Sequence, residues 1–293
     1  MSMVALRRWS LLGAGVAAAL PALALTSNQL LAQLTAHRIQ PRCEFHPARE
    51  AAGGQRVFVG FHGLWSPDWF KPQLEYLQSR GDVLLGLNGA RVDATPQALI
   101  QELTTRGLLD RPVYVIGFSM GSQTAVQFMR LYRQATGRSV AGAAIVSGMA
   151  TPADVIWPQP WLPVLMRWLR GGPLVQLGWR RYWQAKAAAA RAAGLVLDVQ
   201  QAEGALLSHS DSVVSGTRLL QRSLGLVPGE FDGVATLFVE HPADPRVRNC
   251  YQRWQPAFPT SRLVTMVVPG HGEFTLCREA YIEAYDEWLA DAA

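Results

Sequence analysis

Ser119, Asp244 and His271 are three residues whose types and order along the chain could support nucleophilic catalysis. A serine hydroxyl is a poor nucleophile that needs a base to accept its proton, and a histidine base in turn needs an acid to orient it. Each of the three follows an apolar segment that is typical of a buried strand. Such a set would allow the serine to attack a carbonyl carbon and to transfer an acyl group.

Ser119 lies at the centre of the pentapeptide Gly-Phe-Ser-Met-Gly, residues 117–121. The apolar, β-branched segment 113–116 before it is typical of a buried strand, and the apolar spacing of 122–132 after it predicts a helix. A serine on such a strand-to-helix turn, between two glycines, is a nucleophile elbow. The turn is so tight that side chains at the glycine positions would collide with neighbouring backbone. The alternative interpretation is a serine that only caps the following helix.

The elements that must position these residues alternate from residue 56 onward. We expect strands at 56–61, 82–87, 112–116, 140–146, 235–239 and 263–268, and helices at 67–79, 95–106, 119–136, 247–254 and 274–289. The strand segments are continuous apolar runs, as in strands that are buried on both faces. Alternation of this kind predicts an α/β fold with a mostly parallel sheet and helices on both of its faces.

A parallel sheet would bring the three residues together, because the loops after its strands meet at one edge, where such folds bind ligands. Ser119, Asp244 and His271 each lie within five residues of the end of a predicted strand. Two alternatives stay open for the acid. Asp244 precedes Pro245 and could simply cap a helix, and Glu240 at the strand end is a rival for the orienting acid.

Two backbone N–H groups are candidates for an oxyanion hole. The first predicted strand is followed by His62, Gly63 and Leu64. We expect the N–H groups of Leu64 and of Met120, the residue after the serine, to bind the oxyanion of a tetrahedral intermediate. Such a donor can lower the barrier by about 3 kcal/mol. We expect His62 itself to hold this loop in place through a hydrogen bond.

From about residue 55 to its end, the chain resembles the α/β-hydrolase superfamily, in particular small bacterial esterases, lipases and thioesterases. The residues behind the resemblance are Phe61-His62-Gly63, the pentapeptide 117–121, Asp244 within 240–247, and Gly270-His271. The resemblance implies an α/β-hydrolase domain over 38–293, a catalytic triad of Ser119, Asp244 and His271, and acyl transfer without a cofactor. It also implies antiparallel strands at the start of the fold, for which residues 38–45 are the candidate.

Residues 150 to about 230 interrupt the alternation and are expected to form a helical insertion. The resemblance implies that this insertion is a cap over the active site. Five tryptophans occur in it among several prolines: Trp157, Trp161, Trp168, Trp179 and Trp183. These aromatic side chains could pack onto the body of the domain, or they could form a lid that faces an acyl or lipid substrate.

The N-terminus has the layout of a signal peptide or a membrane anchor in residues 1–25. Arg7 and Arg8 precede an uncharged, mostly apolar run over 9–25, and Ala22-Leu23-Ala24 offers a small-x-small cleavage pattern. The run is slightly shorter than the ~20 residues that span a bilayer. We therefore expect a protein that is exported (periplasmic or secreted) or anchored to the membrane facing outward. An ordinary buried helix is the alternative.

The composition is that of a folded globular protein, since 49% of the 293 residues are apolar. The arginines behind the net charge of +5 are spread along the chain without interleaved aromatic residues, so no nucleic-acid partner is expected. The three cysteines, Cys43, Cys250 and Cys277, have no metal-ligand spacing, and no metal is expected. Cys250 and Cys277 could pair if the protein is exported.

The sequence thus predicts a serine hydrolase that cleaves a carboxylic ester or thioester of a small molecule or a lipid, without a cofactor. A peptidase of the same fold would use the same three residues, so an amide substrate stays open. The alternative from another class is a hydrolase-fold protein that binds a ligand without turnover.

Overall fold

The computed structural model describes residues 41–49, 55–64, 70–88, 91–157, 210–248, 250–266 and 278–292, together with Arg181, Ala188 and His271. The N-terminal segment 1–25, most of the insertion and Cys277 lie outside these residues, so what the sequence predicts for them stays a prediction. Within the described part of the chain, no helix combines the length and the apolar character needed to cross a membrane.

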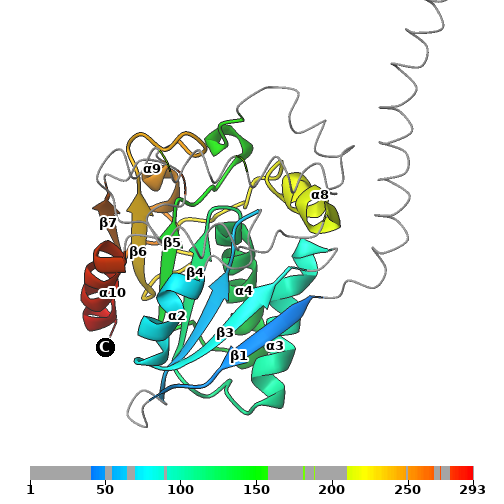
Figure 1. Ribbon diagram of the computed structural model, residues 1–293, viewed down its shortest axis with the longest axis vertical. Coiled ribbons are helices and arrows are strands. Elements are labelled where there is room, and N and C mark those ends of the chain that lie inside the picture. Colours follow the sequence, from blue (N-terminus) through cyan, green and yellow to red (C-terminus); the bar gives the residue numbers. More distant parts are fainter. Residues whose placement is uncertain are drawn as a thin grey trace, which may run out of the picture.

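A seven-stranded sheet forms the centre of the described structure (Figure 1). Its strands are β1 Arg42–His46, β2 Val57–Phe61, β3 Asp82–Leu87, β4 Val113–Phe118, β5 Gly142–Val146, β6 Ala235–Glu240 and β7 Ser261–Thr265. Their order is β1-β3-β2-β4-β5-β6-β7. β1 runs antiparallel to β3, and every other neighbouring pair is parallel. The mostly parallel sheet is therefore confirmed, and β1 overlaps the segment expected for the antiparallel start.

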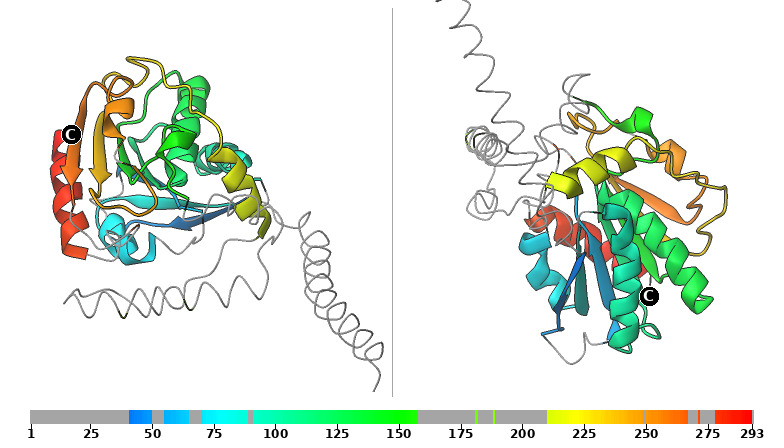
Figure 2. Two further views of the ribbon diagram at one scale, coloured as in Figure 1. Left: turned by 90° about the horizontal axis from the view of Figure 1, so that it is seen from above. Right: turned by 90° about the vertical axis from the view of Figure 1, so that its right-hand side faces the viewer.

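Helices cover both faces of the sheet, as the alternation predicts (Figures 1 and 2). They are α2 Lys71–Gln78, α3 Thr95–Thr105, α4 Gly121–Thr136, α8 Ser210–Leu219, α9 Tyr251–Trp254 and α10 Arg278–Asp291, with short 3-10 helices η3 Val92–Ala94 and η4 Pro152–Asp154. α3 and α4 pack side by side on one face, and α2 and α10 lie together on the other.

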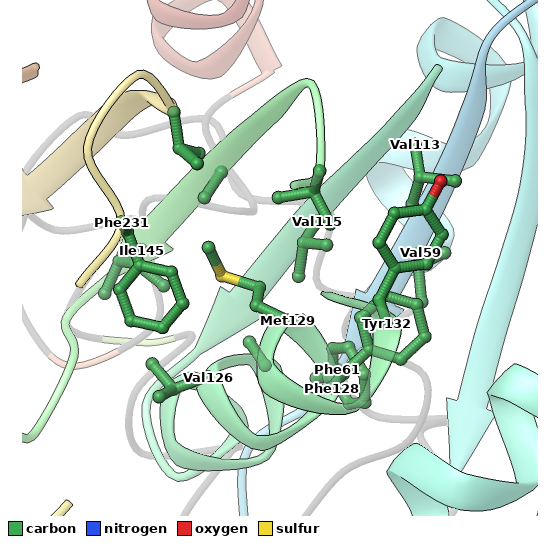
Figure 3. Close-up of a cluster of buried hydrophobic side chains, with 14 of the residues drawn as sticks. Val59, Phe61, Val113, Val115, Val126, Phe128, Met129, Tyr132, Ile145 and Phe231 are labelled. Atoms are coloured by element: carbon green, nitrogen blue, oxygen red, sulfur yellow. The ribbon is translucent and has the colours of Figure 1, made fainter. Parts of the chain in front are cut away.

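Two apolar layers join the helices to the sheet. One contains Phe128, Met129 and Tyr132 of α4, which point toward the central strands (Figure 3). The other contains Tyr76 of α2 and Tyr285 of α10. Burial of one such side chain contributes about 1.5–3 kcal/mol. Because β2, β4 and β5 are buried along their whole length, these strands are continuous apolar runs, whereas the edge strands β1 and β7 are partly exposed.

Two helices begin later than the sequence predicts. α4 begins at Gly121 and not at 119, because Ser119 has a backbone conformation that no α-helix allows. α9 begins at Tyr251 and not at 247, because Val247 instead forms an antiparallel bridge with Val155. Contacts between distant segments, which a local pattern does not contain, therefore decide where α9 starts.

The last strand of the sheet is also shifted from its predicted position. β7 spans Ser261–Thr265, where the sequence predicts 263–268. Ser261 pairs with Thr236 and Thr265 with Glu240, so the length of the neighbouring strand β6 sets both ends. Residues 267 and 268 lie outside the described residues.

Both ends of the predicted insertion pack on the body of the domain. The Leu224 N–H donates to the Ala150 carbonyl oxygen, 3.0 Å away, which brings the two ends of the insertion together. Arg130 of α4 forms an ion pair with Glu230 at 2.6 Å. Between them, α8 lies against η3, which follows β3. The tryptophans from Trp161 to Trp183 lie outside the described residues, so both interpretations of the cap stay open.

Cys250 is a free thiol in this structure and is buried. Its Sγ donates to the Gly148 carbonyl oxygen at 3.1 Å and accepts a hydrogen bond from the indole N–H of Trp254 at 3.2 Å. Burial raises the pKa of this thiol to about 11. The side chain is therefore a neutral packing group, and no disulfide ties α9 to another segment here.

Candidate active site

Ser119 follows directly on the last residue of β4, and its backbone φ is +53°. This left-handed conformation costs a residue with a side chain about 1–3 kcal/mol, so the surrounding structure has to hold it. The Ser119 N–H donates to the Val146 carbonyl oxygen of β5, 2.9 Å away. The Ser119 carbonyl oxygen accepts the N–H and the hydroxyl of Ser122, at 3.0 and 2.6 Å. The tight strand-to-helix turn expected from the pentapeptide is present, and Ser119 is at its strained position.

Close contacts require both glycines of the pentapeptide. A Cβ at Gly117 would lie 2.9 Å from the carbonyl oxygen of Gly121 and 2.8 Å from the Cβ of Ala125. A Cβ at Gly121 would overlap the carbonyl oxygen of Phe61 and lie 2.7 Å from that of His62. Those two oxygens belong to the end of β2 and the loop after it, so the start of α4 is seated directly against this loop.

Gly121→Ala is therefore expected to destabilise the fold by about 1–3 kcal/mol, as overpacking does elsewhere. The free energy of unfolding, measured by urea denaturation, tests this. Gly137→Ala is the control, because Gly137 has a φ of +71° but nothing within 4 Å of an added Cβ, so this change adds backbone strain without overlap. A Gly121→Ala protein as stable as the wild type would show that α4 does not need this contact with β2.

The structure brings Ser119, His271 and Asp244 into one hydrogen-bonded chain. His271 Nε2 lies 2.8 Å from Ser119 Oγ, and His271 Nδ1 lies 2.9 and 3.1 Å from the two carboxylate oxygens of Asp244. An ionised carboxylate can only accept, so Nδ1 carries the proton and donates it to Asp244. In a neutral ring, Nε2 is then the acceptor for the serine hydroxyl. This is the geometry that a general base and its orienting acid require.

Asp244 remains ionised despite its burial, with 2% of its side chain exposed. Burial favours the neutral acid and would raise the Asp244 pKa. The hydrogen bond from His271, the electrostatic attraction of its imidazole and the N–H groups of Arg246 and Val247 outweigh burial, so the Asp244 pKa is lowered below 3.8. The two N–H groups donate to Oδ1 at 2.7 and 3.1 Å. Because the folded pKa is the lower one, this carboxylate stabilises the fold above pH 3.8, and its contribution is lost as the pH falls through the folded pKa.

The capping interpretation of Asp244 is thus partly correct. Its carboxylate accepts two backbone N–H groups, as a cap does, but the segment after Pro245 continues as an extended bridge and not as a helix. The same side chain contacts His271. One carboxylate therefore fixes its own loop and the imidazole together.

Glu240, the rival acid, contacts a different partner. One of its carboxylate oxygens accepts the N–H groups of Cys250 and Tyr251, at 2.8 and 2.6 Å, where α9 begins. Burial of the carboxyl raises the Glu240 pKa, against the effect of these two hydrogen bonds. Glu240 therefore holds the start of α9, and it is Asp244 that the structure places on His271.

The loop after β2 lies beside Ser119, as expected for an oxyanion loop. A Cβ on Gly63 would lie 3.4 Å from the Cβ of Ser119. Among the described residues, neither the Leu64 N–H nor the Met120 N–H donates a hydrogen bond. Within the described part of the chain, both groups are therefore candidates for oxyanion donors.

His62 holds the loop after β2 through hydrogen bonds, as the sequence predicts. The ring lies 2.6 Å from the Gly63 carbonyl oxygen through Nδ1 and accepts the Asn88 N–H at 3.3 Å through Nε2. Since Nε2 accepts, Nδ1 is the atom with the proton, and it donates to Gly63. The ring thus ties the loop after β2 to the end of β3.

Sequence reasoning missed several residues that position the site. The hydroxyl of Ser122 accepts the Met149 N–H at 3.1 Å and so links the elbow to the loop after β5. The ring of Phe118 stacks on the imidazole of His271, with ring centroids 5.0 Å apart. Neither contact has a local signature, because each joins segments that are far apart in the sequence.

Asp154 is a third such residue, and here the sequence holds a signal. Its carboxylate is fully buried, accepts the N–H groups of Ala150 and Thr151 at 3.0 and 2.8 Å, and forms an ion pair with Arg253. The Arg248 N–H donates to the Asp154 carbonyl oxygen at 2.8 Å, in the loop that contains Asp244. The spacing Thr-x-x-Asp at 151–154 is that of a capping box, which would have identified the turn.

An apolar cluster borders the site in the described part of the chain. This cluster of buried side chains comes from η3, the end of α8 and the loops after β2, β4, β5 and β6, and it includes both candidate oxyanion residues: Leu64, Val92, Met120, Met149, Leu219, Leu220 and Val247. Val155 and Trp157 pack against it. Among the described residues, no group of three or more His, Cys, Asp and Glu is placed to hold a metal ion.

Comparison with solved structures identifies proteins of the same architecture. An esterase from Thermogutta terrifontis superposes with a TM-score of 0.63 and 16% identity, over 87% of this chain and 94% of its own. An enol-lactonase from Burkholderia xenovorans superposes with a TM-score of 0.64 and 12% identity, over 87% of this chain and 98% of its own. A putative aryl esterase from Burkholderia cenocepacia superposes with a TM-score of 0.56 and 18% identity, over 86% of this chain and 95% of its own. No protein-family model and no curated protein matches the sequence. Likeness at these identities shows a shared fold.

Proposed function

We propose that this chain, which has the α/β-hydrolase fold, is a serine hydrolase that cleaves carboxylic esters. The observation behind the proposal is the hydrogen-bonded chain from Asp244 through His271 to Ser119, at a serine held in a strained turn. A serine that only capped α4 would need neither the imidazole nor the positive φ. The proposal assigns Ser119 as nucleophile, His271 as base and Asp244 as orienting acid.

In the acylation half of the reaction, Ser119 Oγ attacks the ester carbonyl carbon while His271 Nε2 takes the hydroxyl proton. Asp244 accepts the Nδ1–H throughout and stabilises the imidazolium that forms. The carbonyl oxygen becomes an oxyanion, and the N–H groups of Leu64 and Met120 donate to it. When the tetrahedral intermediate collapses, the bond to the leaving oxygen breaks. His271 returns its proton to that oxygen, which leaves as the alcohol.

In the deacylation half, water takes the place of the alcohol. His271 Nε2 accepts a proton from water, the hydroxide oxygen attacks the acyl carbon, and a second tetrahedral intermediate forms in the same oxyanion hole. Its collapse breaks the bond to Ser119 Oγ, which regains its proton from His271. The products are a carboxylic acid and the free enzyme, and no step needs a cofactor.

The apolar cluster beside Ser119 supports an uncharged acyl group as the substrate. Leu64 and Met120, the two candidate donors, belong to this cluster, so a carbonyl bound between them would have apolar side chains as neighbours. A charged acyl group would be desolvated there without a partner among the residues of the cluster, which is costly. Of the three structural neighbours named above, two are described as esterases (one of them putative) and one as an enol-lactonase, and a lactone is a cyclic ester.

The 293-residue chain is expected to hydrolyse p-nitrophenyl esters of apolar acyl chains and to react with a fluorophosphonate probe at Ser119. A panel of p-nitrophenyl esters from acetate to palmitate, with a thioester and a p-nitroanilide of one matched acyl group, gives kcat/KM for each bond type. Mass spectrometry of the labelled peptide identifies the modified serine. Heat-denatured protein is the control for non-specific labelling.

Three results would contradict this proposal in whole or in part. A folded protein that neither labels nor hydrolyses any ester would favour a binding protein with this fold. Labelling at a serine other than Ser119 would show that a different serine is the nucleophile. A higher kcat/KM for the thioester or the anilide than for the matched ester would keep the three residues and change the substrate class.

A further inference from the structure

Gly216 lies in the interior of α8, at a place where local helix stability alone would disfavour glycine. Glycine is the least favourable residue inside a helix after proline, because it loses the most backbone entropy. A glycine in this position therefore calls for a reason in the packing around it. That reason is visible in its neighbours.

The side chains of the two candidate oxyanion residues meet at Gly216. A Cβ at this position would overlap the sulfur of Met120 and lie 2.5 Å from Cδ1 of Leu64. Met120 is fully buried and Leu64 nearly so, and both belong to the apolar cluster around the site. An added methyl group would therefore have to displace one or both of these buried side chains.

α8 is also fixed to the body at this point. The hydroxyl of Ser215 accepts the Val92 N–H at 3.1 Å, which ties the helix to η3. Leu219 and Leu220, one turn further on, are buried in the same cluster. A helix held on both sides of Gly216 cannot easily tilt away, so the strain from a larger residue would pass to Met120 and Leu64.

We propose that Gly216 is a positioning residue for the oxyanion hole. It lets α8, a helix of the insertion, rest directly on the side chains whose backbone N–H groups stabilise the oxyanion. This inference rests on the proposed function. Oxyanion donors act at 2.7–3.1 Å, so a displacement of a few tenths of an ångström in either residue weakens the transition state more than the bound ester.

Gly216→Ala is expected to lower kcat for a short p-nitrophenyl ester by about 10-fold, since complete loss of one donor costs about 10²–10³-fold. KM is expected to stay within about threefold, because the ground-state ester does not depend on the oxyanion donors. Affinity for a trifluoromethyl ketone, which forms an oxyanion on Ser119, is expected to fall in proportion to kcat. If α8 served only as packing, the fall in affinity for the ketone would not match the fall in kcat.

Met120→Ala, which removes the overlapping sulfur, provides a rescue. Gly216→Ala is expected to lower kcat less when it is added to Met120→Ala than when it is made in the wild type, because the two changes act on the same contact. This pair also keeps the test decisive if Gly216→Ala alone does not fold. Arg218→Ala, on the exposed side of the same helix, is the control and is expected to leave kcat and KM unchanged.

The outcomes separate this inference from the proposed function. An active wild type whose Gly216→Ala variant keeps its kcat, or changes only in KM, would overturn the role of Gly216 and leave the hydrolase proposal intact. An equal loss from Gly216→Ala in the wild-type, Met120→Ala and Leu64→Ala backgrounds would also overturn it. A wild type without ester turnover would overturn the proposed function and this inference together.

Discussion

Ser119→Ala is expected to lower kcat for ester hydrolysis by about 10⁶-fold, the loss typical when the nucleophile of a Ser-His-Asp set is removed. His271 then has no hydroxyl to activate, and no acyl-enzyme can form. The N–H groups of Leu64 and Met120 would still bind a developing oxyanion. A residual rate of about 10³-fold over the uncatalysed reaction is therefore expected.

Ser147→Ala is a closely matched control for this prediction. Ser147 follows directly on the last residue of the neighbouring strand β5, has a φ of +46° and is buried, so it repeats the conformation of Ser119 one strand away. Its N–H donates to the Val239 carbonyl oxygen at 2.8 Å, as the Ser119 N–H does to that of Val146. Among the described residues its hydroxyl makes no hydrogen bond.

Steady-state kinetics and fluorophosphonate labelling of both variants, with circular dichroism to check the fold, give the comparison. Ser147→Ala is expected to keep kcat within about threefold and to label like the wild type. Ser147 does not belong to the hydrogen-bonded chain of Ser119, His271 and Asp244, so its substitution is expected to act mainly on stability. Ser119→Ala is expected not to label. If Ser119→Ala retains turnover, or if Ser147→Ala loses it, the nucleophile assigned here is wrong.

Local sequence predicts the elbow well because the elbow is a local structure. The glycines at 117 and 121, the β-branched run before Ser119 and the helical spacing after it are all required within a few residues of one turn. The parallel sheet follows from the same kind of reasoning, since unbroken apolar strands alternate with helices. Both predictions depend on patterns that neighbouring residues impose on each other.

The contacts that position the site are less accessible to sequence reasoning, because they join segments far apart in the chain. Phe118 stacks on His271, and Gly216 contacts both Met120 and Leu64. The bridge between Val155 and Val247 replaces the first turns of a helix that the local pattern favours. Such contacts exist only once the sheet has brought its loops to one edge.

The choice between Asp244 and Glu240 shows the same limit at the site itself. Glu240 is the last residue of β6 and Asp244 lies four residues later. Each accepts backbone N–H groups, so spacing along the chain does not separate them. The tertiary structure does, by placing the Asp244 carboxylate 2.9 Å from His271 Nδ1 and the Glu240 carboxylate on the first N–H groups of α9. The two residues therefore form a matched pair for a second large prediction.

Asp244→Asn is expected to lower kcat for ester hydrolysis by about 10⁴-fold with little change in the fold. The amide can donate to His271 Nδ1, which would leave the proton on Nε2, where it blocks transfer from Ser119. An amide also lacks the charge that stabilises the imidazolium. Because the Asp244 pKa is lowered below 3.8, the wild-type carboxylate stays ionised down to that pH, and no limb of its pH–rate profile above pH 3.8 is expected to come from Asp244.

Glu240→Gln is the matched variant, and it is expected to keep kcat within about threefold. The carbonyl oxygen of glutamine can still accept the N–H groups of Cys250 and Tyr251, so α9 keeps its start. Burial raises the Glu240 pKa, so the neutral amide also removes a charge that the site disfavours, and stability is expected to be preserved or slightly increased. Rates of both variants on one p-nitrophenyl ester decide between the acids. A large loss from Glu240→Gln beside a near-normal Asp244→Asn would make Glu240 the residue that orients His271 during turnover.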